Sequence, residues 1–147
     1  MNILNTKIFI ADDDADDRDM FEDALVEISS EIKLNQAKDG KELMDMLEEL
    51  VPPIPDVIFL DLNMPLKNGF ECLEEIRNTD KLRKIPIVIF STSCDKDFID
   101  RAYKQGADYY ICKPSSFALL KNMVSRILAI DWQQQISQPS RNQFVIN

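Results

Sequence analysis

The order of short apolar runs and helix-period segments is the feature that most narrows what this chain can fold into. Five segments are strand-like, being short and either apolar throughout or alternating: 7–11, 32–37, 57–60, 87–90 and 108–112. Each is followed by a segment that repeats apolar side chains at helical spacing: 14–28, 41–50, 70–78, 96–105 and 115–130. Regular alternation of this kind predicts a parallel sheet with helices on both faces and right-handed crossovers. We expect an α/β fold with a doubly wound, five-stranded parallel sheet, a (βα)5 flavodoxin-like arrangement.

The length and the end of the chain predict one domain. The chain has 147 residues, which is the size of a single compact domain. We assign residues 1–130 to this domain and 131–147 to a C-terminal tail, with no separate output domain. The tail is either loosely ordered or docked on the body or on a partner through Trp132 and residues 144–146.

Charge and apolar content exclude two classes of partner. The formal net charge is −9, whereas a nucleic-acid surface requires clustered lysine and arginine. The longest apolar runs are of strand length, and residues 1–6 lack the features of a signal peptide. We therefore expect a cytoplasmic protein that binds neither nucleic acid nor membranes.

Cysteine and histidine usage narrows the chemistry further. Cys72, Cys94 and Cys112 are odd in number and unclustered, so we expect reduced thiols rather than a disulfide framework or a zinc site. The sequence contains no histidine. Triads with a histidine base, histidine-ligated metals and a phosphohistidine within this chain are therefore excluded. The remaining groups for chemistry are carboxylates, hydroxyls and lysine, with a hard cation.

Complementary side chains follow four of the expected strands. In an open parallel sheet, ligands bind beyond the carboxyl ends of the strands. The side chains expected at this edge are Asp12, Asp13, Asp61, Asn63, Ser91 and Lys113. Clustered carboxylates repel one another unless a cation neutralises them, and oxygen-only ligation with room for water suits Mg²⁺. A lysine and a hydroxyl nearby complement an incoming phosphoryl group, and one carboxylate is then available as the nucleophile.

Each of these residues has an ordinary explanation when it is taken alone. The acids at 12–14 are also typical of a helix N-cap, where they favour the positive end of the macrodipole. Asp61 is also typical of a turn, Lys113 of the surface, and Ser91 of a polar strand end. Their joint occurrence at four strand ends favours the functional interpretation.

These residues stand in motifs that resemble bacterial response-regulator receiver domains, over residues 7 to about 130. The motifs are IADDD at 10–14, FLDLNMPLKNG at 59–69, IVIFSTS at 87–93 and YYICKP at 109–114. The resemblance implies the following roles. Asp61 is the phosphorylation site, and Mg²⁺ is bound by Asp12, Asp13, Asp61 and the backbone carbonyl of Asn63. Lys113, before a cis bond to Pro114, contacts the phosphoryl group, and Ser91 and Tyr110 form the switch.

The resemblance also implies how such a switch is used. A sensor histidine kinase or a histidine phosphotransfer protein donates the phosphoryl group, and Ser91 and Tyr110 then remodel a face made by residues 96–105, 108–112 and 115–130. A downstream protein, or a second copy in a homodimer, reads that face. The single-domain form is similar to chemotaxis regulators and to small regulators paired with phytochrome-like kinases. Such a protein is a phospho-acceptor with self-catalysed phosphotransfer and autodephosphorylation, rather than an enzyme.

Two other functions remain open at this point. A Mg²⁺-dependent aspartyl-phosphate phosphohydrolase usually has an acid two residues after its nucleophile, where this chain has Asn63. A non-phosphorylated, receiver-like scaffold is the other alternative, although the full set of site residues is present. Mg²⁺-dependent labelling on Asp61 distinguishes the switch from the scaffold, and the absence of multiple turnover on free phosphomonoesters distinguishes it from the phosphohydrolase.

Overall fold

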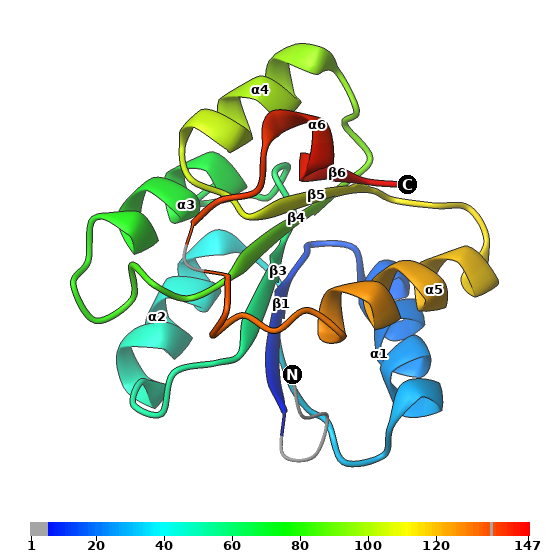
Figure 1. Ribbon diagram of the computed structural model, residues 1–147. Helices are drawn as coiled ribbons and strands as arrows, with labels where there is room; N and C mark the ends of the chain where they lie inside the picture. The colour runs from blue at the N-terminus through cyan, green and yellow to red at the C-terminus, as the bar shows by residue number, and fades with distance from the viewer. Residues whose placement is uncertain (1–5, 136) are drawn as a thin grey trace.

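The sheet has six parallel strands in the order β2-β1-β3-β4-β5-β6 (Figure 1). The computed structural model describes residues 6–135 and 137–147. The strands are β1 (Lys7–Ala11), β2 (Lys33–Ala37), β3 (Val57–Leu60), β4 (Ile87–Ser91), β5 (Tyr109–Cys112) and β6 (Val145–Ile146). The helices are α1 (Ala15–Ile28), α2 (Gly40–Leu50), α3 (Gly69–Arg77), α4 (Lys96–Lys104), α5 (Phe117–Leu128) and α6 (Arg141–Phe144). The predicted doubly wound α/β fold is confirmed.

Each face of the sheet is covered by its own helices because side chains alternate along the strands. Phe9 in β1 and Ile58 in β3 point into a core with α2, α3 and α4. Their neighbours Ile8 and Val57 point into the other core, which α1 and α5 complete. The same division is visible in Figure 1, where α1 and α5 lie together on one side of the sheet. Burial on both faces explains why the central strands are apolar throughout.

The sixth strand corrects the predicted strand number. β6 has two residues and pairs with the outer side of β5, with Tyr110 opposite Val145 and Ile111 opposite Ile146. Two residues are too few to produce a periodic pattern, so the sequence contains no strand signal there. The expected five strands are present, and the tail adds one at the edge. Within the described residues, no helix is both long and apolar enough to cross a membrane.

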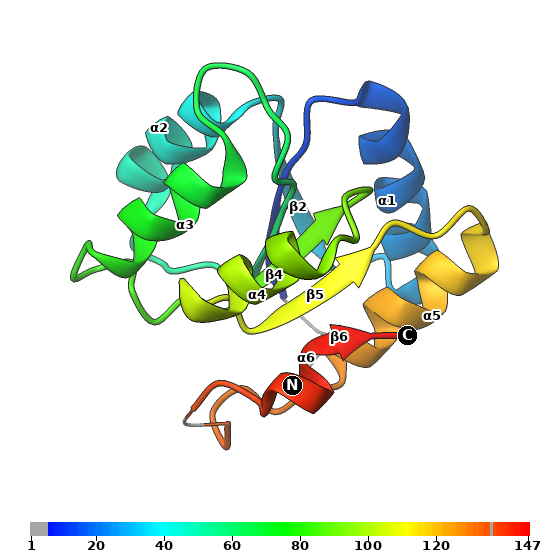
Figure 2. The ribbon, with the colours of Figure 1, turned by 90° about the horizontal axis from the view of Figure 1, so that it is seen from above.

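The described part of the tail is docked on the body rather than loose. Phe144 is fully buried, and its ring packs edge-on against Tyr103 of α4 at 5.0 Å between centroids. The hydroxyl of Tyr103 donates to the carbonyl of Pro139 at 2.7 Å, and Arg141 pairs with Asp100 at 2.9 Å. Figure 2 shows α6 and β6 beside α4, β5 and α5. The tail therefore covers part of the face that the sequence assigns to partners.

Arg77, at the end of α3, forms a second set of tertiary contacts, at the end of the sheet where β4 and β5 begin. Its guanidinium donates to the carbonyls of Gly106 at 2.9 Å and Ile85 at 2.8 Å. It also forms an ion pair with Asp108 at 3.0 Å, and that carboxylate accepts the amide of Ile87 at 2.8 Å. Burial lowers the pKa of Arg77, with Asp108 partly offsetting this effect. One side chain thus ties α3 to the starts of β4 and β5.

We expect Arg77→Ala to lower the free energy of unfolding by about 2 kcal/mol, since it leaves Asp108 and buried carbonyls without their donor. Urea unfolding followed by circular dichroism measures the change. Lys41→Ala, which removes an exposed pair with Asp45, should leave the free energy of unfolding almost unchanged. Equal losses in the two variants would contradict a special role for Arg77.

Candidate functional site

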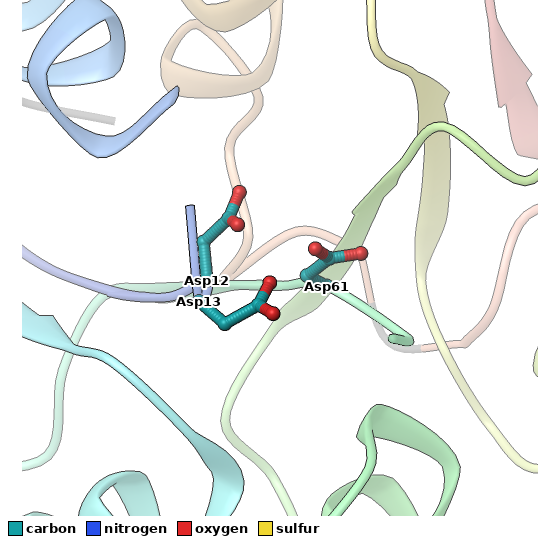
Figure 3. A group of neighbouring side chains, drawn as sticks. All are labelled: Asp12, Asp13 and Asp61. Atoms are coloured by element: carbon teal, nitrogen blue, oxygen red, sulfur yellow. The ribbon is translucent and has the colours of Figure 1, made fainter. Parts of the chain in front are cut away.

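Three carboxylates meet where β1 and β3 end. The two strands pair with Ala11 opposite Leu60, so the residues that follow them emerge side by side. Carboxylate oxygens of Asp12, Asp13 and Asp61 all lie within 4.8 Å of one another. Figure 3 shows the three side chains close together, with the carboxylate of Asp13 directed toward Asp61. Asp12 is fully buried, whereas Asp13 is exposed.

Asp14 has a different role from the two acids before it. Its side chain accepts hydrogen bonds from the amides of Asp16 at 2.9 Å and Asp17 at 3.2 Å, and it thereby caps α1. The N-cap interpretation is therefore correct for Asp14. Asp12 and Asp13 instead belong to the carboxylate cluster.

The backbone around Asp61 is held closely in place. Its amide donates to the carbonyl of Ala11 at 3.0 Å, and its Oδ1 accepts the amide of Leu62 at 2.7 Å. Gly69, the first residue of α3, packs directly against it. A Cβ at this position would lie 2.2 Å from the carbonyl oxygen of Asp61, so only glycine fits without displacing the site. Gly69 belongs to the sequence motif at 59–69, but the reason for a glycine there is this close approach, which depends on the folded structure.

Lys113 brings a positive charge into the cluster from the end of β5. Its Nζ lies 2.7 Å from Asp12 Oδ2, 2.9 Å from Asp17 Oδ2 and 3.3 Å from Asp61 Oδ2. Burial by itself would lower the pKa of Lys113, but hydrogen bonds to Asp12 and Asp17 and the charge of Asp61 raise it above its usual value. The lysine is therefore a fixed cation.

Asp17 was not predicted as a site residue. Acids in the first turn of a helix are typical whether or not a site lies nearby, because they favour the positive end of the helix dipole. The contact of Asp17 with Lys113 joins residues 96 positions apart and depends on the packing of α1 beside α5, the helix that follows Lys113. Its position in an acid-rich first turn next to the cluster was the only available signal.

Ser91 is the last residue of β4, and Tyr110 lies within the neighbouring strand β5, opposite Ile89. The Ser91 hydroxyl is buried and accepts the amide of Ser93 at 3.1 Å. Tyr110 is also fully buried, and its hydroxyl donates to the carbonyl of Ser93. Burial raises the pKa of Tyr110 to about 12, so the hydroxyl keeps its proton. Asn63 reaches the same loop by donating from Nδ2 to Ser93 Oγ at 3.0 Å.

The expected cis bond before Pro114 is not present. The cis peptide bonds of the described residues precede Pro52 and Pro53, and the bond between Lys113 and Pro114 is trans. Trans is the more stable form of such a bond, by roughly 0.5–1 kcal/mol.

The donor set fits a small hard cation. Carboxylate oxygens of Asp12, Asp13 and Asp61 converge at one point, and Asp13 leaves the point open to solvent. Few protein ligands, all of them oxygens, with room for water are the ligands that Mg²⁺ prefers. Burial raises the pKa of Asp12 to about 6, and hydrogen bonds from Lys113 and Asp14 offset only part of this shift. The cluster is therefore an acidic metal-binding site whose charge is only partly balanced by protein groups.

The raised pKa of Asp12 predicts that cation binding depends on pH. Because a metal needs the carboxylate form, protons compete with it once the pH falls below about 6. We expect the dissociation constant for Mg²⁺ to rise about tenfold per pH unit below that point and to change little above it. Calorimetric titration between pH 5 and 8 measures this, and Asp12→Asn should bind more weakly and with a flatter pH profile. A flat profile in the wild-type chain would contradict the prediction.

The expectation of three unpaired thiols is wrong for two of the cysteines. Cys94 and Cys112 have Cα atoms 5.7 Å apart and are joined as a disulfide. They are 18 residues apart in sequence, and they meet because β4 and β5 are neighbours, with Ser91 opposite Cys112. Sequence spacing alone does not reveal such a contact. Cys72 is free and buried, as expected.

Comparison with known proteins identifies the family to which this arrangement belongs. Residues 8–125 match the family model of the response regulator receiver domain. Response regulator Rcp1 of Synechocystis sp. is 28% identical over 137 residues, which cover 90% of this chain and 92% of Rcp1. The probable methanogenesis regulatory protein FilR2 of Methanothrix harundinacea is 36% identical over 98 residues. That match covers 65% of this chain and 63% of FilR2, less than two thirds of its length.

Solved structures have the same architecture. The phosphorylated cyanobacterial phytochrome response regulator RcpA is 32% identical, with a TM-score of 0.79 over 92% of this chain and 99% of RcpA. The Mn²⁺-bound form of Rcp1 is 28% identical, with a TM-score of 0.75 and the same coverage. Both similarities extend over most of the fold described above.

Proposed function

The chain belongs to the response regulator receiver domain family, and from this premise we propose that it is a phospho-accepting switch of a two-component or phosphorelay system. The observation that carries the proposal is the convergence of Asp12, Asp13 and Asp61 with Lys113 at one edge of the sheet. The group phosphorylated is the carboxylate of Asp61. Acting as a phospho-acceptor, the chain is a signalling protein rather than an enzyme with a separate substrate.

The two oxygens of Asp61 have different surroundings, which suggests how it reacts. Oδ1 accepts backbone amides from Leu62 and Asn63, whereas Oδ2 faces Lys113 at 3.3 Å. Oδ2 attacks the phosphorus of the donor while the bond from phosphorus to the donor atom breaks. The ammonium of Lys113 then contacts the transferred phosphoryl oxygens. Asp12, Asp13, Asp61 and the carbonyl of Asn63 would hold Mg²⁺, which would supply positive charge for the same oxygens.

The structural response to phosphorylation begins with side chains that lie near Asp61. The hydroxyl of Ser91 moves toward the phosphoryl group, and the packing of Tyr110 adjusts to it. Because Phe144 packs against Tyr103 and lies 6.0 Å from the ring of Tyr110, the tail belongs to the same surface. We infer that partners read a face made by α4, β5 and α5 together with the docked tail. A second copy of the chain in a homodimer is one such partner.

The donor comes from another molecule, because the chain has no histidine. A groove of about 600 Å³ beside the site is lined by Asp13, Asn63, Phe70, Phe98 and Arg101, among others. Arg101 lies over the ring of Phe70 at 4.0 Å, so the groove has an apolar wall with polar edges. This surface suits a phosphohistidine-bearing helix of a sensor histidine kinase or a histidine phosphotransfer protein in the cytoplasm.

Labelling with a small phosphodonor tests the proposal. We expect the full chain, incubated with acetyl phosphate and Mg²⁺, to acquire one phosphoryl group, and borohydride trapping with mass spectrometry to locate it on Asp61. Chelation of Mg²⁺ should prevent the reaction. Failure to label, together with failure to bind Mg²⁺ at millimolar concentration, would favour a scaffold. Multiple turnover of free phosphomonoesters would favour a phosphohydrolase.

A further inference from the structure

We propose that Cys94 and Cys112 form a reversible thiol–disulfide pair, oxidised by peroxide, that fixes the β4–α4 loop (residues 92–95) beside the phospho-acceptor site. The bond restrains the loop whether or not Asp61 is phosphorylated. Its effect on signalling rests on the proposed function, because the loop joins Ser91 to the face that partners read. We call this face, made by α4, β5, α5 and the docked tail, the output face.

The two cysteines are placed so that oxidation can occur and can be reversed. Their Cα separation of 5.7 Å lies in the range that a disulfide spans, about 4.4–6.8 Å. Cys94 is exposed in the loop and Cys112 is half-buried at the end of β5, so an oxidant or a reductant in solution reaches the pair. Cys72 is excluded from this chemistry, since it is fully buried and burial raises its pKa to about 12.

The bond would fasten the segment through which the switch acts. Cys94 directly follows Ser93, whose carbonyl accepts the hydroxyl of Tyr110 and whose Oγ accepts Asn63. Cys112 lies two residues after Tyr110 on β5. In the reduced chain, hydrogen bonds of this kind hold the loop, and they can be exchanged for others within the native state. In the oxidised chain, a covalent bond spans the same gap.

The oxidation step balances with peroxide as the oxidant. The Cys94 sulfur, the more exposed of the two, attacks one peroxide oxygen, and the O–O bond breaks to release hydroxide and leave a sulfenic acid. The Cys112 sulfur then attacks the Cys94 sulfur, and the S–O bond breaks with loss of a second hydroxide. The two thiol protons convert both hydroxides to water, so two thiols and one peroxide give one disulfide and two waters. A dithiol reductant reverses the bond by thiol–disulfide exchange.

In the oxidised chain, phosphorylation of Asp61 therefore no longer changes the output face. Ser91 directly precedes the loop and Asp95 directly precedes α4, so a shift of Ser91 reaches α4 through residues 92–95. A loop anchored to β5 at Cys112 cannot follow that shift. The output face of the oxidised chain therefore stays in one arrangement.

Hydrogen exchange of the full chain, with peptide mapping, tests the pair without any phosphodonor. We expect millimolar peroxide to link Cys94 to Cys112, to leave Cys72 reduced, and to slow exchange of residues 92–104 by at least about tenfold. Cys94→Ser removes an exposed side chain, and this variant should keep the reduced exchange pattern with or without peroxide. Absence of the cross-link, or a cross-link that leaves exchange unchanged, would overturn the proposal.

A second arm adds acetyl phosphate and Mg²⁺ to both redox forms. The reduced chain should show a phosphorylation-dependent change of exchange in α4, and the oxidised chain should show less than about a third of it. Equal responses in the two forms would overturn the effect on signalling. If neither form accepts a phosphoryl group, the proposed function fails instead, and the cross-link and exchange results still decide whether the loop is redox-controlled.

Discussion

Asp61→Asn is expected to lower labelling by acetyl phosphate by at least about a thousandfold, because an amide is not a nucleophile toward phosphorus. The substitution keeps the local structure. An asparagine Oδ1 can accept the Leu62 amide that Asp61 now accepts at 2.7 Å. It also removes one of three clustered negative charges, so the free energy of unfolding without Mg²⁺ should stay the same or rise. Mass spectrometry after labelling and urea unfolding measure the two effects.

The matched control is Asp80→Asn, which changes an exposed aspartate in the segment after α3. It should label at the wild-type rate. Labelling of Asp61→Asn that persists on Asp12 or Asp13 would show that this site accepts phosphoryl groups without a unique acceptor, and it would contradict the assignment of Asp61.

The fold was predictable because its signals are local. Each strand and helix of the repeating unit has its own periodicity, and the ends of helices have recognisable residues. Ser116, a residue type typical of N-caps, caps α5, and Gly106, two residues after the end of α4, has a positive φ of 96°. β6 was not predictable, because its two residues are held by pairing with β5 and by the burial of Phe144.

The site was predictable where it lies at strand ends. The parallel sheet brings the residues after β1 and β3 to one edge, so Asp12, Asp13 and Asp61 could be placed together from the order of elements alone. Asp17 and the cysteine pair depend on distances between elements, and neither helical period nor strand alternation encodes those distances. For the same reason, a half-buried acid and two cysteines, one exposed and one half-buried, have no distinguishing pattern in the sequence.

Lys113→Met tests whether, in the metal-free site, the ammonium of Lys113 supplies the positive charge that a bound Mg²⁺ would supply. Methionine keeps most of the apolar stem, so the change isolates the charge that lies within 3.3 Å of Asp12, Asp17 and Asp61. We expect the metal-free variant to lose about 3 kcal/mol in its free energy of unfolding, because the carboxylates then repel one another without compensation. Thermal and urea unfolding in the presence of a chelator measure this loss.

The pH dependence of that loss follows from Asp12. Removing Lys113 removes hydrogen bonds that lower the pKa of Asp12, so the pKa rises above its present value of about 6. A carboxyl whose pKa is higher in the folded than in the unfolded state contributes stability at low pH and loses it as the pH rises. The variant should therefore be closer to wild type at pH 5 than at pH 8.

Mg²⁺ should restore more stability to Lys113→Met than to the wild type, because the metal supplies the missing charge and meets no competing ammonium. A concentration one hundred times the dissociation constant contributes about 2.7 kcal/mol. Lys41→Ala, at an exposed pair with side chains 67% and 62% accessible, should show neither the loss nor the restoration. Equal stabilisation of wild type and Lys113→Met by Mg²⁺ would show that the lysine and the metal do not compete for the same carboxylates.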